Sequence, residues 1–363
     1  MRIFDDISDT YFLCMRKPIF WFAFLGTALV ISWLVSGLTF REREEVPEFS
    51  FETINGISLV APVHALEENV FTDLKHINST WISLMPYAFF RPENPIIRFD
   101  SPRQWWGEKT EGIIASIQSA KKHQLKVLLK PHLWISHGGY TGDFALEKEE
   151  DWNLWEQSYR DYTLHFAGIA DSMQVEMFCI GTELGKAISE RKSFWNELID
   201  SVRAVYKGQL VYAANWDDYA DIPFWSRLDA IGIDAYFPLC ESKTPDPDVM
   251  KVAWKQHIRG MQKLSKKIKK PVIFTEFGYR DADYAAHEPW TESSGVINHL
   301  AQANAYEALF QSLEHQTWFK GGFVWKWYVD DFYRRREEPD YTPQGKPAEK
   351  IIGKWYGNFW EKD

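Results

Sequence analysis

Eight short apolar runs follow one another along the chain after residue 53, and longer segments with helical patterns separate most of them. The runs are rich in β-branched and aromatic residues, which is typical of strands. They are GISLVAP (56–62), TWISLMP (80–86), LKVLLKPH (125–132), EMFCIGTE (176–183), QLVYAANW (209–216), AIGIDAYF (230–237), PVIFTEFGY (271–279) and GGFVWKWY (321–328). This alternation of strand and helix patterns indicates βα units around a parallel sheet.

The helical segments support the same interpretation. Apolar side chains recur every three or four residues in two of them, at Trp155, Tyr159, Tyr162 and Phe166 and again at Phe194, Leu198 and Val202. Eight strands within residues 54–363 predict a (β/α)8 TIM barrel. A doubly wound sheet is the alternative, but such a sheet normally has a Gly-rich phosphate turn after its first strand. The segment HALEEN (64–69) has no such turn.

The pattern before the barrel is different, because residues 18–40 contain no charged side chain. About 20 apolar residues are enough to cross a bilayer as a helix. Trp21 and Trp33 stand toward the two ends of this run, where interfacial aromatics are enriched. The run is longer than a usual signal-peptide core, and no Ala-x-Ala cleavage site follows it. We expect an uncleaved transmembrane anchor at 18–40, between a cytoplasmic tail (1–17) and a linker (41–53); a buried core helix is the alternative.

The composition does not favour a nucleic-acid-binding, disulfide-rich or zinc-binding protein. The net charge of −10 gives no electrostatic footprint for nucleic acid, and the basic cluster KKIKK (266–270) is typical of a solvated helix end. Cys14, Cys179 and Cys240 form neither a disulfide framework nor a zinc-ligand spacing. The chain has 18 Trp residues, which is unusually many.

Chemistry in a TIM barrel gathers at the carboxyl ends of the strands. Polar, acidic and aromatic residues stand there in this chain: Lys130, His132 and Trp134, Glu183, Asn215, Trp216 and Asp217, Asp234 and Tyr236, Glu276 and Tyr279, and Trp325 and Trp327. Core packing does not explain this asymmetry, because burying carboxylates is costly. Each residue has a simpler reading by itself, and Glu183 alone would be a helix-start acid favoured by the helix dipole. The conjunction indicates a site.

Two glutamates on the fourth and seventh strands, Glu183 and Glu276, would face each other across the barrel mouth. Glycoside hydrolysis needs such a carboxyl pair, one protonated to donate and one ionised to attack. Two neighbouring carboxylates raise the pKa of one of them, which supplies the protonated partner. Tryptophans at the rim offer flat faces for sugar rings. This chemistry needs no metal or cofactor, and we find no metal-ligand spacing in the sequence.

At this point the sequence resembles glycoside hydrolase family 113, within the clan A retaining glycosidases and best known for endo-β-1,4-mannanases. The resemblance runs in order across nearly the whole domain after residue 53. It rests on VLLKPHLW (127–134), FCIGTEL (178–184), LVYAANWD (210–217), LDAIGIDAYFPL (228–239), PVIFTEFGYR (271–280) and GFVWKW (322–327).

The resemblance implies roles for individual residues. Glu183 would be the general acid/base and Glu276 the nucleophile, with Tyr236 hydrogen-bonded to Glu276. Trp325 would form the floor under the sugar that is cleaved. Lys130, His132, Asn215, Trp216 and Asp234 would complete the substrate-binding set. The implied outcome is retention of configuration, which requires carboxyl groups about 5–5.5 Å apart.

One position departs from the clan. Most clan A enzymes have Asn immediately before the acid/base, where it binds the sugar 2-hydroxyl, and this chain has Thr182. That contact is therefore unassigned, with Asn215 as a candidate. Because mannose and glucose differ in the orientation of this hydroxyl, the departure bears on substrate identity.

We expect a monomeric, membrane-anchored retaining β-glycosidase that hydrolyses β-1,4-mannan or mannooligosaccharides. Its catalytic domain would lie outside the cytoplasm, in the periplasm or the extracellular space, because a polysaccharide hydrolase should face its substrate. A β-glucan hydrolase or an exo-mannosidase would use the same residues. A membrane-held carbohydrate-binding pseudoenzyme is a further alternative, which the presence of both glutamates and Tyr236 disfavours. The segment Ile135 to Asp151 could wall off one end of the cleft.

Overall fold

The computed structural model describes residues 49–65, 70–136, 139–291, 295–329 and 338–358, all within one compact unit, Val46–Asp363. The tail and the membrane span expected at 18–40, and most of the expected linker, lie outside the described residues. Within them, no helix has both the length and the apolar character needed to cross a bilayer.

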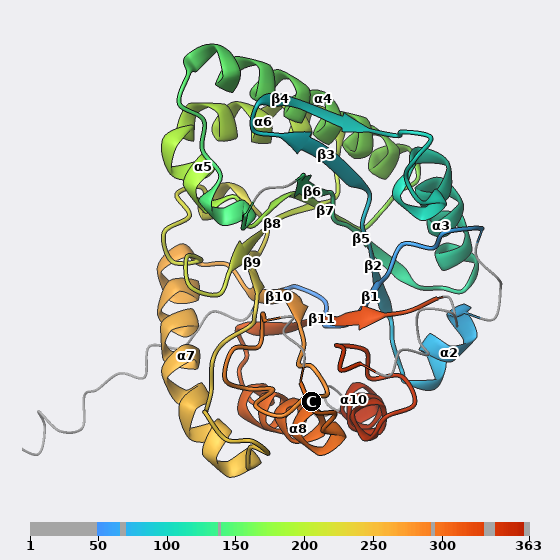
Figure 1. The fold of residues 1–363 in the computed structure, drawn as a ribbon, viewed down its shortest axis with the longest axis vertical. Helices are drawn as coiled ribbons and strands as arrows, with labels where there is room; N and C mark the ends of the chain where they lie inside the picture. The colour runs from blue at the N-terminus through green and yellow to red at the C-terminus, as the bar shows by residue number, and fades with distance from the viewer. Residues whose placement is uncertain (1–48, 66–69, 137–138, 292–294, 330–337, 359–363) are drawn as a thin grey trace, which may run out of the picture. The chain divides into compact units, whose positions relative to one another are not determined.

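Eight parallel strands close into a barrel, which Figure 1 shows nearly end on with the helices around it. In the order in which they are hydrogen-bonded, the strands are β1 (Ile54–Leu59), β11 (Phe319–Trp327), β10 (Val272–Phe277), β9 (Ile231–Asp234), β8 (Gln209–Asn215), β7 (Met177–Thr182), β5 (Lys126–Leu129) and β2 (Trp81–Leu84). The eight apolar runs of the sequence are these eight strands. The predicted (β/α)8 barrel is confirmed, and the doubly wound alternative is excluded because the sheet is closed.

The helices lie outside the barrel and follow most of its strands. They are α2 (Val70–His76), α3 (Thr110–Lys122), α4 (Glu149–Ser172), α5 (Gly185–Glu190), α6 (Lys192–Val205), α7 (Pro247–Ile268), α8 (His299–Leu313) and α10 (Pro347–Asn358). The described residues also contain three short 3₁₀ turns, η1 (Trp106–Glu108), η2 (Thr141–Asp143) and η3 (Trp225–Arg227). Only η3 lies between β8 and β9, where the other barrel strands have a helix.

The predicted helical faces are the buried faces. On α4, the side chains of Trp155, Tyr159, Tyr162 and Phe166 are all at most 2% exposed. Burial of such aromatic side chains contributes about 2 kcal/mol each before entropy is counted, so this face fixes α4 against the barrel. The basic cluster 266–270 is the end of α7, where Lys269 takes the left-handed conformation that terminates the helix.

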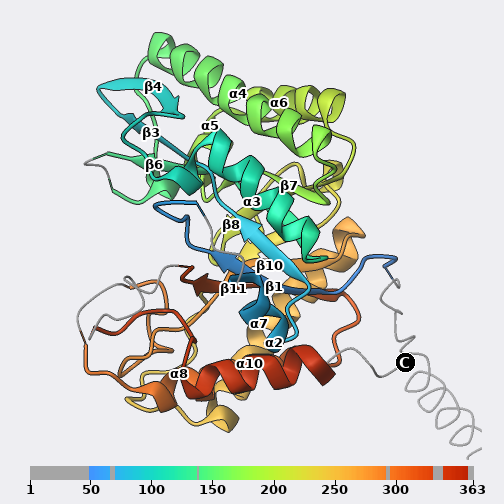
Figure 2. The same ribbon diagram turned by 90° about the vertical axis from the view of Figure 1, so that its right-hand side faces the viewer.

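A second, three-stranded sheet was not predicted. It has the order β4 (Asn94–Phe99), β3 (Tyr87–Arg91) and β6 (His132–Ile135). β3 follows the carboxyl end of β2 and β6 follows that of β5, so this sheet continues beyond one end of the barrel, as Figure 2 shows. Its outermost strand, β4, lies beside α4, and the Ile97 amide donates to the Ser158 hydroxyl there at 3.0 Å.

The strand register of the barrel places three polar side chains at the same height along neighbouring strands. Asp234 is paired with Glu276 between β9 and β10, and Asn215 is paired with Asp234 between β8 and β9. These three residues therefore stand side by side at the carboxyl rim. Below them the strand bodies are apolar and almost fully buried. The polar rim residues therefore stand on a packed apolar core that fills the barrel interior.

Candidate active site

A cavity of about 730 Å³ opens at this rim, and both predicted catalytic glutamates line it. It also contains six of the seven predicted substrate-binding residues: His132, Asn215, Trp216, Asp234, Tyr236 and Trp325. The seventh, Lys130, was expected to line the sugar side, but its side chain is fully buried. Its ammonium group is bound instead by the carboxylates of Asp234 and Glu276.

Glu276 lies at the centre of a set of donors. The Lys130 ammonium donates to its Oε1 at 2.5 Å, and the Tyr236 hydroxyl donates to its Oε2 at 2.8 Å. His132 Nε2 lies 3.5 Å from Oε1. Charge-assisted hydrogen bonds on both oxygens fix the orientation of this carboxylate. The predicted contact between Tyr236 and Glu276 is present.

Lys130 connects Glu276 to a second buried acid, Asp234. Its ammonium lies 3.1 and 3.2 Å from the two oxygens of Asp234, whose Oδ1 also accepts from the Thr275 hydroxyl at 2.7 Å. Burial alone would lower the pKa of Lys130, but Asp234 and Glu276 outweigh it and raise that pKa above its ordinary value. Lys130 is therefore a permanent cation between the two acids. Asp234 supports the floor of the site by holding Lys130.

Glu183 has the opposite surroundings. Burial raises the pKa of its carboxyl well above the ordinary value, and the charges of Asp234 and Glu276 raise it further against the opposing effect of Lys130. Within the described part of the chain, its carboxyl makes no hydrogen bond. A carboxyl group in this setting keeps its proton to higher pH, which is what a general acid requires.

The backbone of Glu183 is unusual as well. Its φ is +49°, in the left-handed region that non-glycine residues avoid at a cost of about 1–2 kcal/mol. Its amide donates to the Ala213 carbonyl of β8 at 2.8 Å, and α5 begins only at Gly185. Glu183 therefore lies before the helix rather than within its first turn. Backbone strain of this kind concentrates at functional sites.

Aromatic rings form one wall of the cavity. The rings of His132 and Trp325 are parallel, with an interplanar angle of 3° and centroids 6.2 Å apart. Burial lowers the pKa of His132 well below its ordinary value, and the Lys130 charge lowers it further. His132 is thus a neutral imidazole. Trp216 and Trp290 also line the cavity, and their rings stack at a centroid distance of 5.0 Å.

The contact to the sugar 2-hydroxyl has two candidates in the cavity. The Asn215 amide donates to Asp217 Oδ1 at 2.9 Å, so part of its hydrogen-bonding capacity is used. The Thr182 hydroxyl is buried and has no partner among the described residues, although Thr182 lines the cavity. Burying a hydroxyl without a hydrogen-bond partner is costly. The Thr182 hydroxyl is therefore better placed than the Asn215 amide to bind a ligand hydroxyl.

Several cavity residues were not predicted from the sequence. Tyr87 follows the end of β2 and could have been found by the strand-end rule that identified the others. Tyr140, Trp290 and Tyr341 come from long loops, where the sequence carries no signal of position. Tyr140 belongs to the segment Ile135 to Asp151, which contributes residues to the lining of the cavity; whether this segment closes one end of the cleft stays a prediction.

Within the described ranges, no group of three or more His, Cys, Asp or Glu side chains has a geometry suited to a metal ion. Lys130 occupies the position between Asp234 and Glu276 that a cation would need.

Comparison with solved structures gives matches along nearly the whole domain. The family 113 β-mannanase of Alicyclobacillus acidocaldarius, solved in complex with ManMIm, is 25% identical with a TM-score of 0.74, over 86% of this chain and all of its own. A second family 113 β-1,4-mannanase, also solved as a complex, is 24% identical with the same TM-score, over 85% of this chain and all of its own. The β-glucuronidase of Ruminococcus gnavus shares the fold alone, at 13% identity and a TM-score of 0.56, over 84% of this chain and 50% of its own.

The family assignment comes from the sequence itself. A comparison with curated proteins gives no match. The sequence profile of Glycoside Hydrolase Family 113, however, matches residues 64–346, which include every candidate site residue named above. Together with the barrel and the two solved relatives, this confirms the resemblance: the chain is a glycoside hydrolase and belongs to glycoside hydrolase family 113.

Proposed function

We propose that the chain is a retaining β-mannanase that cleaves β-1,4-mannosidic linkages in mannan or mannooligosaccharides. The observation that carries this proposal is the opposed setting of the two glutamates, one held by Lys130 and Tyr236 and the other surrounded by acids. Both family 113 relatives are β-mannanases, which supports mannan as the substrate class.

In the first step, the ionised Glu276 attacks the anomeric carbon and forms a glycosyl ester, while Glu183 gives its proton to the departing glycosidic oxygen. Tyr236 and Lys130 hold the attacking carboxylate in one orientation until the bond forms. In the second step, Glu183, now ionised, takes a proton from water, and the water oxygen attacks the same carbon. The ester breaks, Glu276 leaves as a carboxylate, and the sugar keeps its configuration.

Trapping the intermediate tests the assignment of the nucleophile. A 2-deoxy-2-fluoro-β-mannosyl fluoride should form a stable ester, because the fluorine slows the second step more than the activated first step. Mass spectrometry of the digested protein should place the added sugar on the peptide that contains Glu276. Label on another carboxylate, or an inverted first product by NMR, would refute the double-displacement proposal.

Substrate identity is tested by a product profile on mannan, glucomannan and cellulose. Mannooligosaccharides of mixed length from mannan would support an endo-mannanase. Release of single mannose units would instead favour an exo-mannosidase, and preferential cleavage of cellulose would favour a β-glucanase; both use the same two glutamates.

We assign the 2-hydroxyl contact to Thr182, since its hydroxyl lines the cavity without a partner in the described residues. Thr182→Val keeps the shape and removes the hydroxyl. It should lower kcat/KM on mannan about tenfold, the loss of one buried hydrogen bond, whereas Thr182→Ser should stay within about threefold of the wild type. Equal losses in both variants would contradict the assignment.

We further propose that residues 18–40 anchor the enzyme in a membrane with the barrel outside the cytoplasm. The charge-free apolar run supports this. Membrane fractionation, followed by protease treatment of intact cells or spheroplasts, tests it. A barrel recovered in the aqueous fraction, or protected from protease until the membrane is opened, would contradict the proposal.

A further inference from the structure

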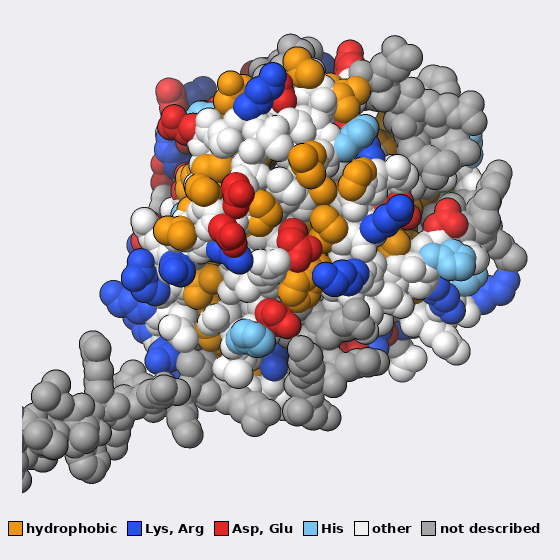
Figure 3. Space-filling model, turned by 90° about the horizontal axis from the view of Figure 1, so that it is seen from below, with side chains coloured by type: hydrophobic (Ala, Val, Ile, Leu, Met, Phe, Trp, Pro, Cys, Tyr) orange, Lys and Arg blue, Asp and Glu red, His pale blue; other side chains and the backbone are white. Residues whose placement is uncertain are grey.

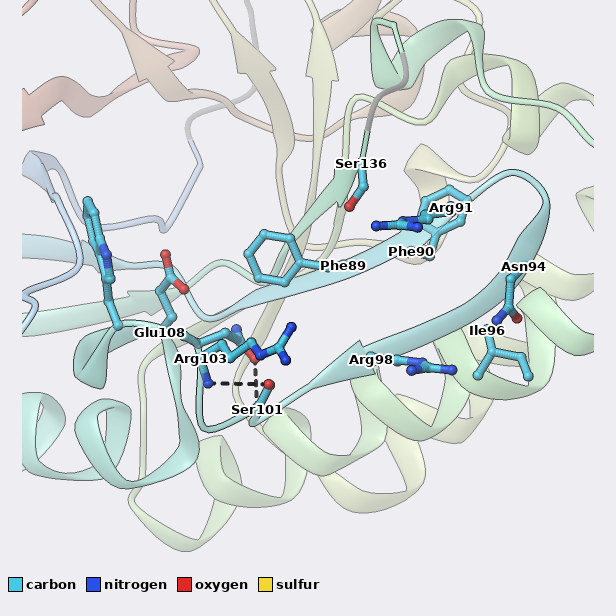
Figure 4. Close-up of a pocket in the computed structure, with 12 residues that line it drawn as sticks. Phe89, Phe90, Arg91, Asn94, Ile96, Arg98, Ser101, Arg103, Glu108 and Ser136 are labelled. Carbon is cyan, nitrogen blue, oxygen red and sulfur yellow. Dashed lines mark hydrogen bonds between the residues drawn. The ribbon is translucent and has the colours of Figure 1, made fainter.

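A second cavity, of about 660 Å³, lies on the exposed face of the small sheet. We call it the basic groove, and its lining includes Phe89, Arg91, Arg98, Arg103, Glu108 and Ser136. Figure 4 shows the Phe89 ring between Ser136 and Arg103, with Arg91 and Arg98 farther along β3 and β4. Among the described charged side chains of this lining, three are arginines and one is acidic.

The three arginines are exposed, and no described residue forms an ion pair or a side-chain hydrogen bond with any of their guanidinium groups. Four arginines elsewhere on the barrel are paired with acids: Arg160 with Glu197, Arg191 with Glu149 and Glu156, Arg203 with Asp229, and Arg227 with Asp200. Figure 3 shows a different face, on which acidic and basic side chains are interspersed. The basic groove therefore combines an excess of positive charge with guanidinium donors that no described residue uses.

A row of aromatic rings connects the basic groove to the active site. Trp325 stacks with His132, His132 lies 5.2 Å from Tyr87, and Tyr87 stacks with Phe89 at 6.5 Å, all between ring centroids. Tyr87 and Phe89 are two residues apart on β3 and therefore lie on the same face of the strand, which brings their rings side by side. The row begins at the candidate floor of the cleft and ends inside the groove.

The strand register places an arginine side chain on the same face of the small sheet as these rings. Phe89 is paired with Arg98 of β4 on one side and with Trp134 of β6 on the other. Trp134 is 58% exposed, which is unusual for its size. One exposed surface thus carries stacking rings near the cleft and guanidinium groups at its far end.

We propose that the basic groove binds a carboxylate-bearing sugar unit of the same saccharide chain whose neighbouring units occupy the catalytic cleft. Sugar rings stack on flat aromatic faces, and guanidinium groups bind carboxylates through paired donors. The inference rests on the proposed function, the hydrolysis of a polysaccharide, but it does not require that the main chain of this polysaccharide is mannan. An anionic membrane surface is the competing occupant; it would use the arginines but leave the row of rings unexplained.

The test uses the full-length protein and four polymers: mannan and its carboxymethyl derivative, and hydroxyethyl cellulose with carboxymethyl cellulose of similar chain length. Dissociation constants are measured by calorimetry at low and high salt. The wild type should bind the carboxymethyl form of its preferred backbone more tightly than the neutral form, and salt should reduce this preference. The triple variant Arg91→Ala, Arg98→Ala, Arg103→Ala should weaken binding of the carboxymethyl form about tenfold, as three exposed ion pairs would.

The matched control removes three positive charges from the far side of the barrel. Lys255, Arg259 and Lys263 are exposed on α7, and the variant with all three changed to Ala should keep the full preference. The rate of hydrolysis of the uncharged polysaccharide should change less than about twofold in both triple variants. Failure to cleave mannan would overturn the proposed function, whereas a preference that survives loss of the three arginines would overturn this inference.

Two further results complete the test. Phe89→Ala should weaken binding of the neutral and the carboxymethyl polymer alike, because it removes a stacking surface rather than a charge. If the arginine variant binds both polymers as the wild type does but loses binding to vesicles that contain phosphatidylserine, the groove is a membrane contact and the saccharide assignment is wrong.

Discussion

The two sides of the cleft treat their glutamates in opposite ways. On the β10 side, Glu276 receives a hydrogen bond on each oxygen and lies against a buried ammonium. On the β7 side, Glu183 has no described hydrogen-bond partner for its carboxyl, and burial together with nearby acids raises its pKa. The two residues are the same amino acid at matching strand ends. Their environments alone decide that one is suited to attack and the other to donate a proton.

This difference shows where the site is preorganised. Lys130, Asp234 and Thr275 form a buried network that fixes Glu276, the proposed nucleophile. Glu183, the proposed acid, needs no such network, because burial beside negative charges is enough to retain its proton. The following variants separate the two sides, from the largest expected effect to the smallest.

Glu276→Gln and Glu183→Gln should both abolish mannan hydrolysis but differ on an activated substrate. Glu276→Gln should lower kcat by more than about 10⁴-fold on any substrate, the order lost when hydrolases lack their nucleophile. Glu183→Gln should cost about 10²–10⁴-fold on mannan. On 2,4-dinitrophenyl β-mannoside it should still release a burst of dinitrophenolate, because that leaving group needs no proton. Stopped-flow absorbance measures the burst.

Azide supplies the control for this pair. It is a nucleophile that needs no general base, so it should accelerate the second step in Glu183→Ala and yield a mannosyl azide of retained configuration. If azide rescues Glu276→Ala with retention instead, or if Glu276→Gln gives the burst, the two roles are reversed.

Lys130→Met should be the most destabilising change in the network. It leaves Asp234 and Glu276 buried without their cation, and breaking a buried pair in this way costs about 3–5 kcal/mol of unfolding free energy. Urea unfolding followed by tryptophan fluorescence measures the loss. Adding Asp234→Asn should restore part of it, since one of the two stranded charges disappears. A double variant no more stable than the single one would contradict the proposed electrostatic cause.

Tyr236→Phe should have a smaller effect that falls on catalysis. It removes one hydrogen bond to a charged group, worth about 1.5–3 kcal/mol, so kcat/KM on mannan should fall roughly 10- to 100-fold. Tyr341→Phe is the control, because Tyr341 also lines the cavity but donates to the Pro289 carbonyl at 2.6 Å. Equal losses in the two variants would show that the tyrosines act through packing.

Much of the fold could be predicted because its signals are local. Each barrel strand is a single apolar run, and α4 and α6 each bury one periodic face. The small sheet was missed although the side chains of β3 and β4 do alternate between exposed and buried. Its third strand, β6, comes from about 40 residues farther along the chain, and the pairing of β3 with β6 has no local signature.

The site shows the same limit. The strand-end rule identified many of the residues that line the cavity, because a parallel barrel brings all carboxyl ends to one rim. Tyr279 and Trp327 also stand at strand ends, but they are buried and do not line the cavity. It misjudged Lys130, since a residue's position at a strand end does not reveal whether its side chain turns outward or is drawn inward by buried acids. Tyr140, Trp290 and Tyr341 reach the cavity from loops whose paths depend on tertiary packing.

The smallest expected effect concerns the pH at which activity declines. Glu183 must be protonated to donate, so the rate should fall as pH rises through its raised pKa. Among the charges acting on it, Asp218 contributes to that rise. Burial and the Asp217 charge raise the pKa of Asp218 itself to about 6, so Asp218 is negative above that pH.

Asp218→Asn should therefore make Glu183 easier to ionise and move the basic limb of the kcat/KM profile to lower pH, with little change at its maximum. Asp221→Asn is the matched control, because Asp221 is exposed and acts on Asp218 rather than on Glu183. The two profiles are measured on mannan across the same buffers. A limb that stays in place in Asp218→Asn, or moves to higher pH, would mean that Asp218 does not help to raise the pKa of Glu183, which would then depend on burial and on Asp234 and Glu276.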